Sequence, residues 1–138
     1  MIILDTNVVS ETMQLSPSPV VMAWFDRVAT GSLFVTVVTV AEIFYGVELL
    51  PGGKRREKLQ IEAEATFAQD FPGRILAFDE EAARVFSKLA TGRRSRSRPI
   101  ADFDAQIAAI AVVHGATLAT RNVTDFQDCG VRLTNPWE

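Results

Sequence analysis

Short apolar runs alternate with segments of helical periodicity along the whole chain, and this alternation restricts the fold more than any other feature. The runs are rich in β-branched residues, which favour strands, and they fall at residues 1–4, 33–38, 74–78, 116–119 and 131–134. Strands that alternate with helices predict a mostly parallel sheet of about five strands between two layers of helices. We therefore expect a three-layer α/β/α fold and, at 138 residues, a single domain spanning residues 1–138.

Capping and breaking residues delimit the expected helices. The Ser-Pro-Ser-Pro stretch 16–19 can start a helix that ends near Gly31, and Thr39 and Glu42 have the spacing of a capping box that opens the next one. Segments 54–71 and 79–89 are also expected to be helical. The basic tract 91–98 is expected to be a loop, followed by a helix that starts at Pro99 and ends at Gly115.

Asp5 ends the first apolar run abruptly. In open α/β sheets, ligands bind outside the carboxyl ends of the strands, which is where Asp5 would lie. Aspartate is also common in turns, where its side chain caps the backbone. Taken alone, Asp5 is explained equally well as a functional residue and as a cap.

Four further polar residues are expected near the same edge of the sheet. Glu42 follows the second strand, Asp104 lies in the helix before the fourth strand, and Asn122 and Asp125 follow the fourth strand. Judged singly, Glu42 is explained by the capping box and Asp125 by an ordinary loop. Clustered carboxylates repel one another, and a hard divalent cation with oxygen ligands compensates for that repulsion. The set therefore points to Mg²⁺ or Mn²⁺.

Asp104 is favoured over Asp102 as the functional acid of its helix. Asp104 shares a face with the apolar residues Ile107, Ala108 and Ala111, where an acid is rarely left unpaired. Asp102 points away from that face and suits the first turn of the helix, because the helix dipole favours an acid there.

Composition excludes several kinds of site. The chain has one cysteine, Cys129, and one histidine, His114, so an intrachain disulfide and a zinc site built on several thiolates are excluded. The net charge of −3 does not by itself predict nucleic-acid binding, although basic clusters occur at 54–58 and 93–98. No basic leader precedes the first apolar run, and no segment is long enough to span a bilayer, so we expect a cytoplasmic protein without a membrane contact.

In five segments, the chain resembles the PIN-domain ribonucleases, in particular the VapC-type toxins of type II toxin–antitoxin pairs and their FitB-like branch. The matching segments are Leu4-Asp5-Thr6-Asn7, residues 39–46, residues 104–109 with His114-Gly115, residues 119–126, and Asn135-Pro136-Trp137. Each motif is short, but the five occur in the family order from the first residues to the last.

The resemblance implies a metal-dependent endoribonuclease that hydrolyses RNA with Mg²⁺ or Mn²⁺. By the family pattern, Asp5 and Asp104 are the main metal ligands, and Glu42 helps to hold the metal or to orient water. Thr6 assists through its hydroxyl and Asn7 buttresses the loop. The fourth family acid falls on Asn122, which carries no charge, so Asp125 is an alternative for that role.

The resemblance also implies the partners. These are an RNA substrate, a VapB- or FitA-like DNA-binding antitoxin, and a second copy of the chain in a homodimer or a higher assembly. The arginines of the tract 91–98 are candidates to steer RNA: Arg93, Arg94, Arg96 and Arg98. Two alternatives stay open, namely a catalytically weak module that binds antitoxin or nucleic acid, and an aspartate-based phosphatase of the haloacid-dehalogenase type.

Overall fold

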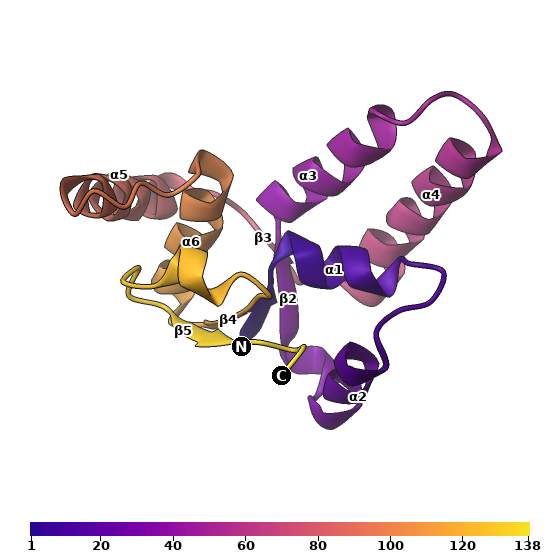
Figure 1. Cartoon of the computed structure of the whole chain (residues 1–138), viewed down its shortest axis with the longest axis horizontal. Helices are drawn as coiled ribbons and strands as arrows, with labels where there is room; N and C mark the ends of the chain where they lie inside the picture. The colour runs from indigo at the N-terminus through magenta and orange to yellow at the C-terminus, as the bar shows by residue number, and fades with distance from the viewer.

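Five parallel strands form the centre of the molecule, as the computed structural model of all 138 residues shows (Figure 1). The sheet order is β3-β2-β1-β4-β5, and Ile3 of β1 pairs with Phe34 of β2 and Leu118 of β4. Because β1 lies in the middle, its carboxyl end opens onto the centre of the sheet edge. The strands are β1 (Ile2–Leu4), β2 (Leu33–Thr36), β3 (Ile75–Leu76), β4 (Thr117–Ala119) and β5 (Arg132–Thr134).

Six α-helices cover the two faces of the sheet. α5 and α6 lie on one face and α1 to α4 on the other, so the predicted three-layer α/β/α architecture is confirmed (Figure 1). The helices are α1 (Thr6–Thr12), α2 (Pro19–Arg27), α3 (Val37–Glu48), α4 (Lys54–Ala65), α5 (Glu80–Ser95) and α6 (Asp102–His114).

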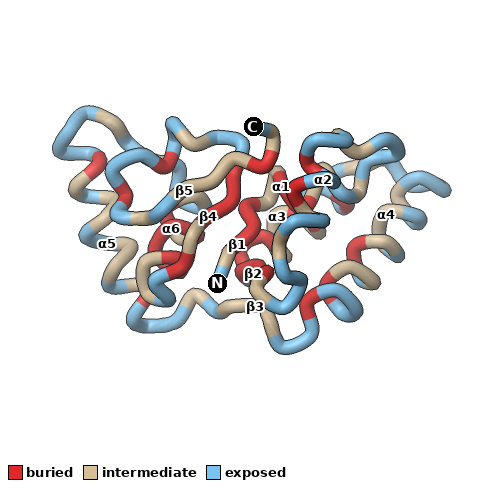
Figure 2. Tube along the Cα trace, turned by 90° about the horizontal axis from the view of Figure 1, so that it is seen from below, coloured by how far each residue is buried: buried red, intermediate tan, exposed pale blue.

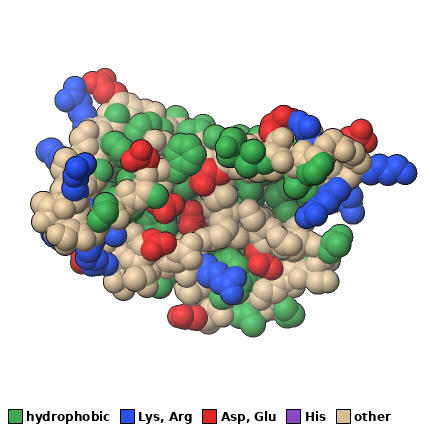
Figure 3. Space-filling model, turned by 45° about the horizontal axis from the view of Figure 1, so that its top comes forward, with side chains coloured by type: hydrophobic (Ala, Val, Ile, Leu, Met, Phe, Trp, Pro, Cys, Tyr) green, Lys and Arg blue, Asp and Glu red, His purple; other side chains and the backbone are tan.

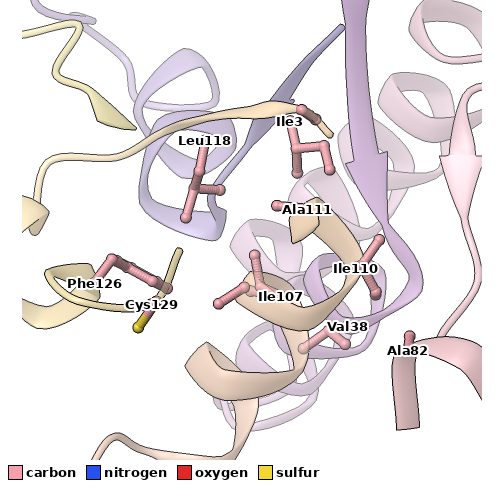
Figure 4. Close-up of a cluster of buried hydrophobic side chains, with 11 residues drawn as sticks. Ile3, Val38, Ala82, Ile107, Ile110, Ala111, Leu118, Phe126 and Cys129 are labelled. Atoms are coloured by element: carbon pink, nitrogen blue, oxygen red, sulfur yellow. The ribbon is translucent and has the colours of Figure 1, made fainter. Parts of the chain in front are cut away.

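Each face of the sheet has its own hydrophobic core. Successive strand residues point to opposite faces, so Ile3 packs into the core beneath α5 and α6, and Leu4 packs into the core beneath α1 to α4. Ile107 and Ile110 of α6 are fully buried in the first core (Figure 4). Burial is concentrated along β1, β2 and β4 and the helix faces turned toward them (Figure 2). The central strands are thereby fixed from both sides.

Several helices begin or end at the predicted capping residues. Ser18 caps α2 with Pro19 at its first position, and Asp79 caps α5 through a 2.9 Å hydrogen bond from the Ala82 N–H. Gly115 ends α6 in the left-handed region, at φ 60°. The predicted helix 54–71 is α4 followed by a π-helical turn, Thr66–Asp70.

The start of α3 was predicted wrongly, and α1 was missed. The second strand ends at Thr36, whose hydroxyl caps α3 by accepting a hydrogen bond from the Thr39 N–H, so Thr39 and Glu42 do not form a capping box. α1 was not predicted, because Thr, Asn and Val are modest helix formers. It is held instead by the Asp5 cap and the burial of Val8 and Val9.

The predicted loop 91–98 was also wrong over most of its length. α5 continues to Ser95, because arginine is a good helix former and cations favour the carboxyl end of a helix. The first predicted helix ends at Arg27 rather than near Gly31, and the last begins at Asp102 rather than at Pro99. None of the helices combines the length and the apolar character that a membrane crossing requires.

Candidate active site

An open cleft of about 450 Å³ lies where the chain leaves β1 and β4. Acidic side chains gather at the centre of this face of the molecule, and lysines and arginines lie mostly toward its two ends (Figure 3). A larger cavity of about 1220 Å³ lies between α1, α3 and α4, but it contains none of the predicted catalytic acids. The smaller cleft is therefore the candidate site. Its 11 lining residues include Asp5, Thr6, Asn7, Glu42, Asp104, Arg121, Asn122 and Trp137.

Asp5 lies at the bottom of this cleft with only 4% of its surface exposed. Its Oδ1 accepts a hydrogen bond from the Thr6 N–H at 2.8 Å, so it does cap α1. Its Oδ2 accepts hydrogen bonds from the Thr120 hydroxyl at 2.7 Å and from the Asn7 amide at 3.2 Å. Burial raises the pKa of Asp5, and these three hydrogen bonds offset the rise only in part. Asp5 is thus both the N-cap of α1 and a buried carboxylate with a raised pKa.

Glu42 is tied to Asp5's neighbour Thr6. The Thr6 hydroxyl donates to Glu42 Oε1 at 2.7 Å and lies 3.0 Å from the Thr39 hydroxyl. Because a hydroxyl has one proton, Thr39 must be the donor to Thr6. This chain of hydrogen bonds links α3 to the start of α1 and leaves Glu42 Oε2 without a hydrogen-bond partner.

Asp104 occupies the first turn of α6, is partly buried and accepts no hydrogen bond from the protein. Its pKa is raised to about 6, first by burial and then by the charges of Asp5, Glu42 and Asp125. Asp102 is exposed and does not line the cleft, so the structure places Asp104, and not Asp102, among the acids.

Asn122 and Asp125 belong to the segment that follows β4. Asn122 lines the cleft, and Asp125 lies in the 3₁₀ turn Val123–Phe126 on the surface. The charge of Asp125 nevertheless raises the pKa of both Asp5 and Asp104. Asn122 thus lies in the cleft, as predicted. Asp125 does not line it, but its charge acts on the two aspartates there.

The donor set suits a hard divalent cation. Four carboxylates, Asp5, Glu42, Asp104 and Asp125, provide oxygen ligands and an excess of negative charge that raises the pKa of Asp5 and Asp104. No three acid, histidine or cysteine side chains are arranged as direct ligands of one ion. Mg²⁺ keeps several waters and is commonly held by one or two carboxylates, so this spacing fits an ion that is partly hydrated.

The four arginines predicted to steer RNA differ in burial and in their contacts. Arg93 is buried, with 5% of its surface exposed, and donates to the carbonyl oxygens of Arg98, Asp125 and Gln127 at 2.8–3.0 Å. A guanidinium engaged in this way holds the 125–129 segment and does not face solvent, so the RNA-steering prediction for Arg93 was wrong. Arg94 and Arg96 are exposed, and Arg98 pairs with Asp128 at 2.9 Å.

Sequence reasoning assigned no role to Thr120, Arg121 or Trp137. Thr120 directly follows β4, the neighbour of β1, so the strand-end rule that singled out Asp5 could also have found it. Arg121 and Trp137 line the cleft from segments 16 residues apart, and no local pattern in the sequence indicates their contact.

Comparison with known proteins agrees with the fold. The family model for the PIN domain matches residues 2–129. The chain is 38% identical to the VapC ribonuclease Y4jK of Sinorhizobium fredii, over 100% of this chain and 99% of that protein. It is also 38% identical to toxin FitB of Neisseria gonorrhoeae, over 99% of each. The solved structure of FitAB bound to the IR36 DNA fragment superposes with a TM-score of 0.93 at 38% identity, over 100% of this chain and 96% of that one. The match to the PIN family model argues against the phosphatase alternative. The chain belongs to the PIN-domain family, in the group of the VapC ribonucleases and FitB toxins.

Proposed function

We propose that the chain, acting as one domain, is an endoribonuclease that hydrolyses RNA phosphodiester bonds with a bound Mg²⁺ or Mn²⁺ ion. One observation carries the proposal: Asp5, Glu42 and Asp104 come from three separate elements and line one cleft. Relatives at 38% identity that are named ribonuclease and toxin support it.

Asp5 and Asp104 would hold the cation, and Glu42 would act on a water molecule through Oε2. Asp104 is best suited to the role, because neither of its oxygens accepts a hydrogen bond and because burial and neighbouring negative charges raise its pKa. When bound, the cation would stabilise negative charge on the phosphate and lower the pKa of a water molecule. Binding at neutral pH would also keep Asp104 ionised, because a ligand must be deprotonated.

The residues around the acids keep them in position during the reaction. Thr120 and Asn7 hold Asp5 Oδ2, and Thr6 holds Glu42 Oε1. Glu42 Oε2 remains free to accept a proton from water and to orient it for attack on phosphorus, in line with the departing oxygen. Because both carboxylates are fixed before substrate arrives, little reorganisation is needed at the moment of reaction.

The test is cleavage of a structured RNA in the presence of Mg²⁺ or Mn²⁺. We expect EDTA, Asp5→Asn and Asp104→Asn each to abolish cleavage. Asp102→Asn is the matched control, because it removes the same charge two residues away outside the cleft and should leave the rate within about twofold. Cleavage that resists EDTA or survives both active-site substitutions would refute the mechanism. RNA binding by the wild type without cleavage would identify a catalytically weak binding module instead.

We further propose that the protein is the toxin of a type II toxin–antitoxin pair, with a VapB- or FitA-like DNA-binding antitoxin as partner. The name toxin FitB and the DNA-bound FitAB structure support this role. Expression of the chain should arrest growth, and co-expression of the adjacent short reading frame should restore it. Growth arrest by the Asp104→Asn variant equal to that of the wild type would contradict a toxicity based on catalysis. We expect the chain to form a homodimer, which light scattering can measure.

A further inference from the structure

Arg121 is the only cationic side chain among the 11 residues that line the acidic cleft. It is exposed, forms no ion pair, and donates no hydrogen bond from its side chain. An arginine beside several carboxylates would ordinarily pair with one of them, because the bidentate geometry is favourable. Its free donors therefore need an explanation.

Trp137 keeps this guanidinium in place. The Cζ atom of Arg121 lies 5.0 Å from the centre of the Trp137 ring, which is the geometry of a cation–π contact. The ring is half-buried and packs against the core beneath α1 to α4. The contact thus places the guanidinium on a firm support, with its N–H groups unpaired.

The backbone on both sides of the contact is also fixed. The Thr120 N–H donates to the Thr134 carbonyl at 2.9 Å, which joins the end of β4 to the C-terminal segment. The Trp137 N–H donates to Asn135 Oδ1 at 2.9 Å. Because the Thr120 hydroxyl contacts Asp5, Arg121 has a set position relative to the acids.

We propose, on the basis of the function proposed above, that Arg121 binds a backbone phosphate of the RNA next to the scissile one, and that Trp137 is the residue that positions it. A guanidinium binds phosphate through paired N–H donors, and those of Arg121 are free. Its positive charge counters the repulsion between the acidic cleft and the RNA backbone. Stacking of a base on Trp137 fits less well, because the guanidinium lies over one face of the ring and the ring packs into the core. A phosphate contact acts on RNA of any sequence.

The experiment measures RNA binding in EDTA, where the proposed function predicts no cleavage, and steady-state cleavage in Mg²⁺. Arg121→Ala should raise the Kd about tenfold and make the plot of log K against log salt less steep by about 0.7, the value for one phosphate contact on a single strand. In cleavage, KM should rise about tenfold and kcat should change by less than about threefold. Arg84→Ala is the matched control, because it removes one positive charge from the exposed surface of α5, where Arg84 pairs with Glu80.

The role of Trp137 is tested through Arg121. Trp137→Leu should raise KM, and the double variant with Arg121→Ala should bind no more weakly than Arg121→Ala alone, because Trp137 acts through the arginine. Trp137→Phe keeps an aromatic support and should stay within about threefold of the wild type. Thermal melts and circular dichroism of the Trp137 variants show whether the fold is retained.

Three results would overturn the inference. If the wild type cleaves RNA and Arg121→Ala matches Arg84→Ala in Kd and salt slope, the phosphate contact is absent although the proposed function stands. If Arg121→Ala weakens binding of an antitoxin but not of RNA, the site recognises protein. If the wild type neither binds nor cleaves RNA, both proposals fail together.

Discussion

The Asp104→Asn variant should be more stable than the wild type in metal-free buffer at pH 7.5. The pKa of Asp104 rises from 3.8 to about 6 in the folded protein, first through burial and then through the charges of Asp5, Glu42 and Asp125. At neutral pH the folded protein therefore keeps an unfavourable carboxylate, which unfolding releases into water. Asparagine has nearly the same size and removes the charge.

The magnitude follows from the shift in pKa. At about 1.36 kcal/mol per pH unit, the full shift corresponds to roughly 3 kcal/mol. Asp104 is only partly buried, so solvent screening reduces the expected gain in free energy of unfolding to about 1–1.5 kcal/mol. For a chain of this length, such a gain raises Tm by about 3–6 °C.

The sign of the pH dependence is fixed by the direction of the shift. An acid with a raised pKa binds more protons in the folded than in the unfolded state between pH 3.8 and about 6. The wild type therefore loses stability as the pH rises through this window, and the full penalty is present above it. The advantage of Asp104→Asn should shrink as the pH falls from 7.5 toward 4.

Thermal and urea unfolding of both proteins in EDTA, at several pH values, provides the assay. Asp102→Asn is the control, because Asp102 is exposed in the same helical turn and its loss removes only a favourable interaction with the helix dipole. That variant should be unchanged or slightly less stable. A loss of stability in Asp104→Asn at pH 7.5, or a gain that does not depend on pH, would refute the electrostatic account.

Three other substitutions or additions test the remaining contacts. Arg93→Met should lower the free energy of unfolding by about 2–4 kcal/mol in urea, because it removes the donor to the carbonyls of Arg98, Asp125 and Gln127; a loss under about 1 kcal/mol would contradict its structural role. Thr120→Val removes the donor to Asp5 Oδ2 and should destabilise the protein by about 1 kcal/mol at pH 7, whereas Thr120→Ser should not; equal melts for the two variants would disprove the contribution of the hydroxyl. Mg²⁺ should raise the Tm of the wild type more at pH 7.5 than at pH 5.5, because protons compete with the ion for Asp104. Mg²⁺ should also raise the Tm of Asp104→Asn less than that of the wild type. Equal shifts in Tm for the two proteins in scanning calorimetry would argue against Asp104 as a ligand.

The strands and the sheet could be predicted because their signal is local. Ile3, Leu4, Val35 and Leu118 are buried members of apolar runs, and burial on both faces requires such runs. The end of β2 was misplaced because Val37 and Val38 are β-branched, although the Thr36 cap had already started a helix. In that case a single side-chain hydrogen bond outweighed the intrinsic preference of two residues.

Arg93 shows the limit of sequence reasoning at the site. A cluster of arginines is expected to face solvent, because a buried charge needs compensating partners. Here the partners are backbone carbonyls, two of which lie more than 30 residues away in the segment after β4. The choice of Asp104 over Asp102 rested on helical spacing and the helix dipole, and the structure places Asp104, not Asp102, in the cleft, since both properties are local to one helix.

The three residues after β1 explain how one short motif can organise the whole cleft. β1 lies between β2 and β4, so the chain leaving it passes both α3, which follows β2, and the segment that follows β4. Thr6 reaches α3 through Glu42 and Thr39, while Asp5 and Asn7 reach Thr120 after β4. The same residues at an edge strand would have a neighbour on one side only. The position of β1 at the centre of the sheet is therefore what lets Asp5, Thr6 and Asn7 contact both Glu42 on α3 and Thr120 after β4.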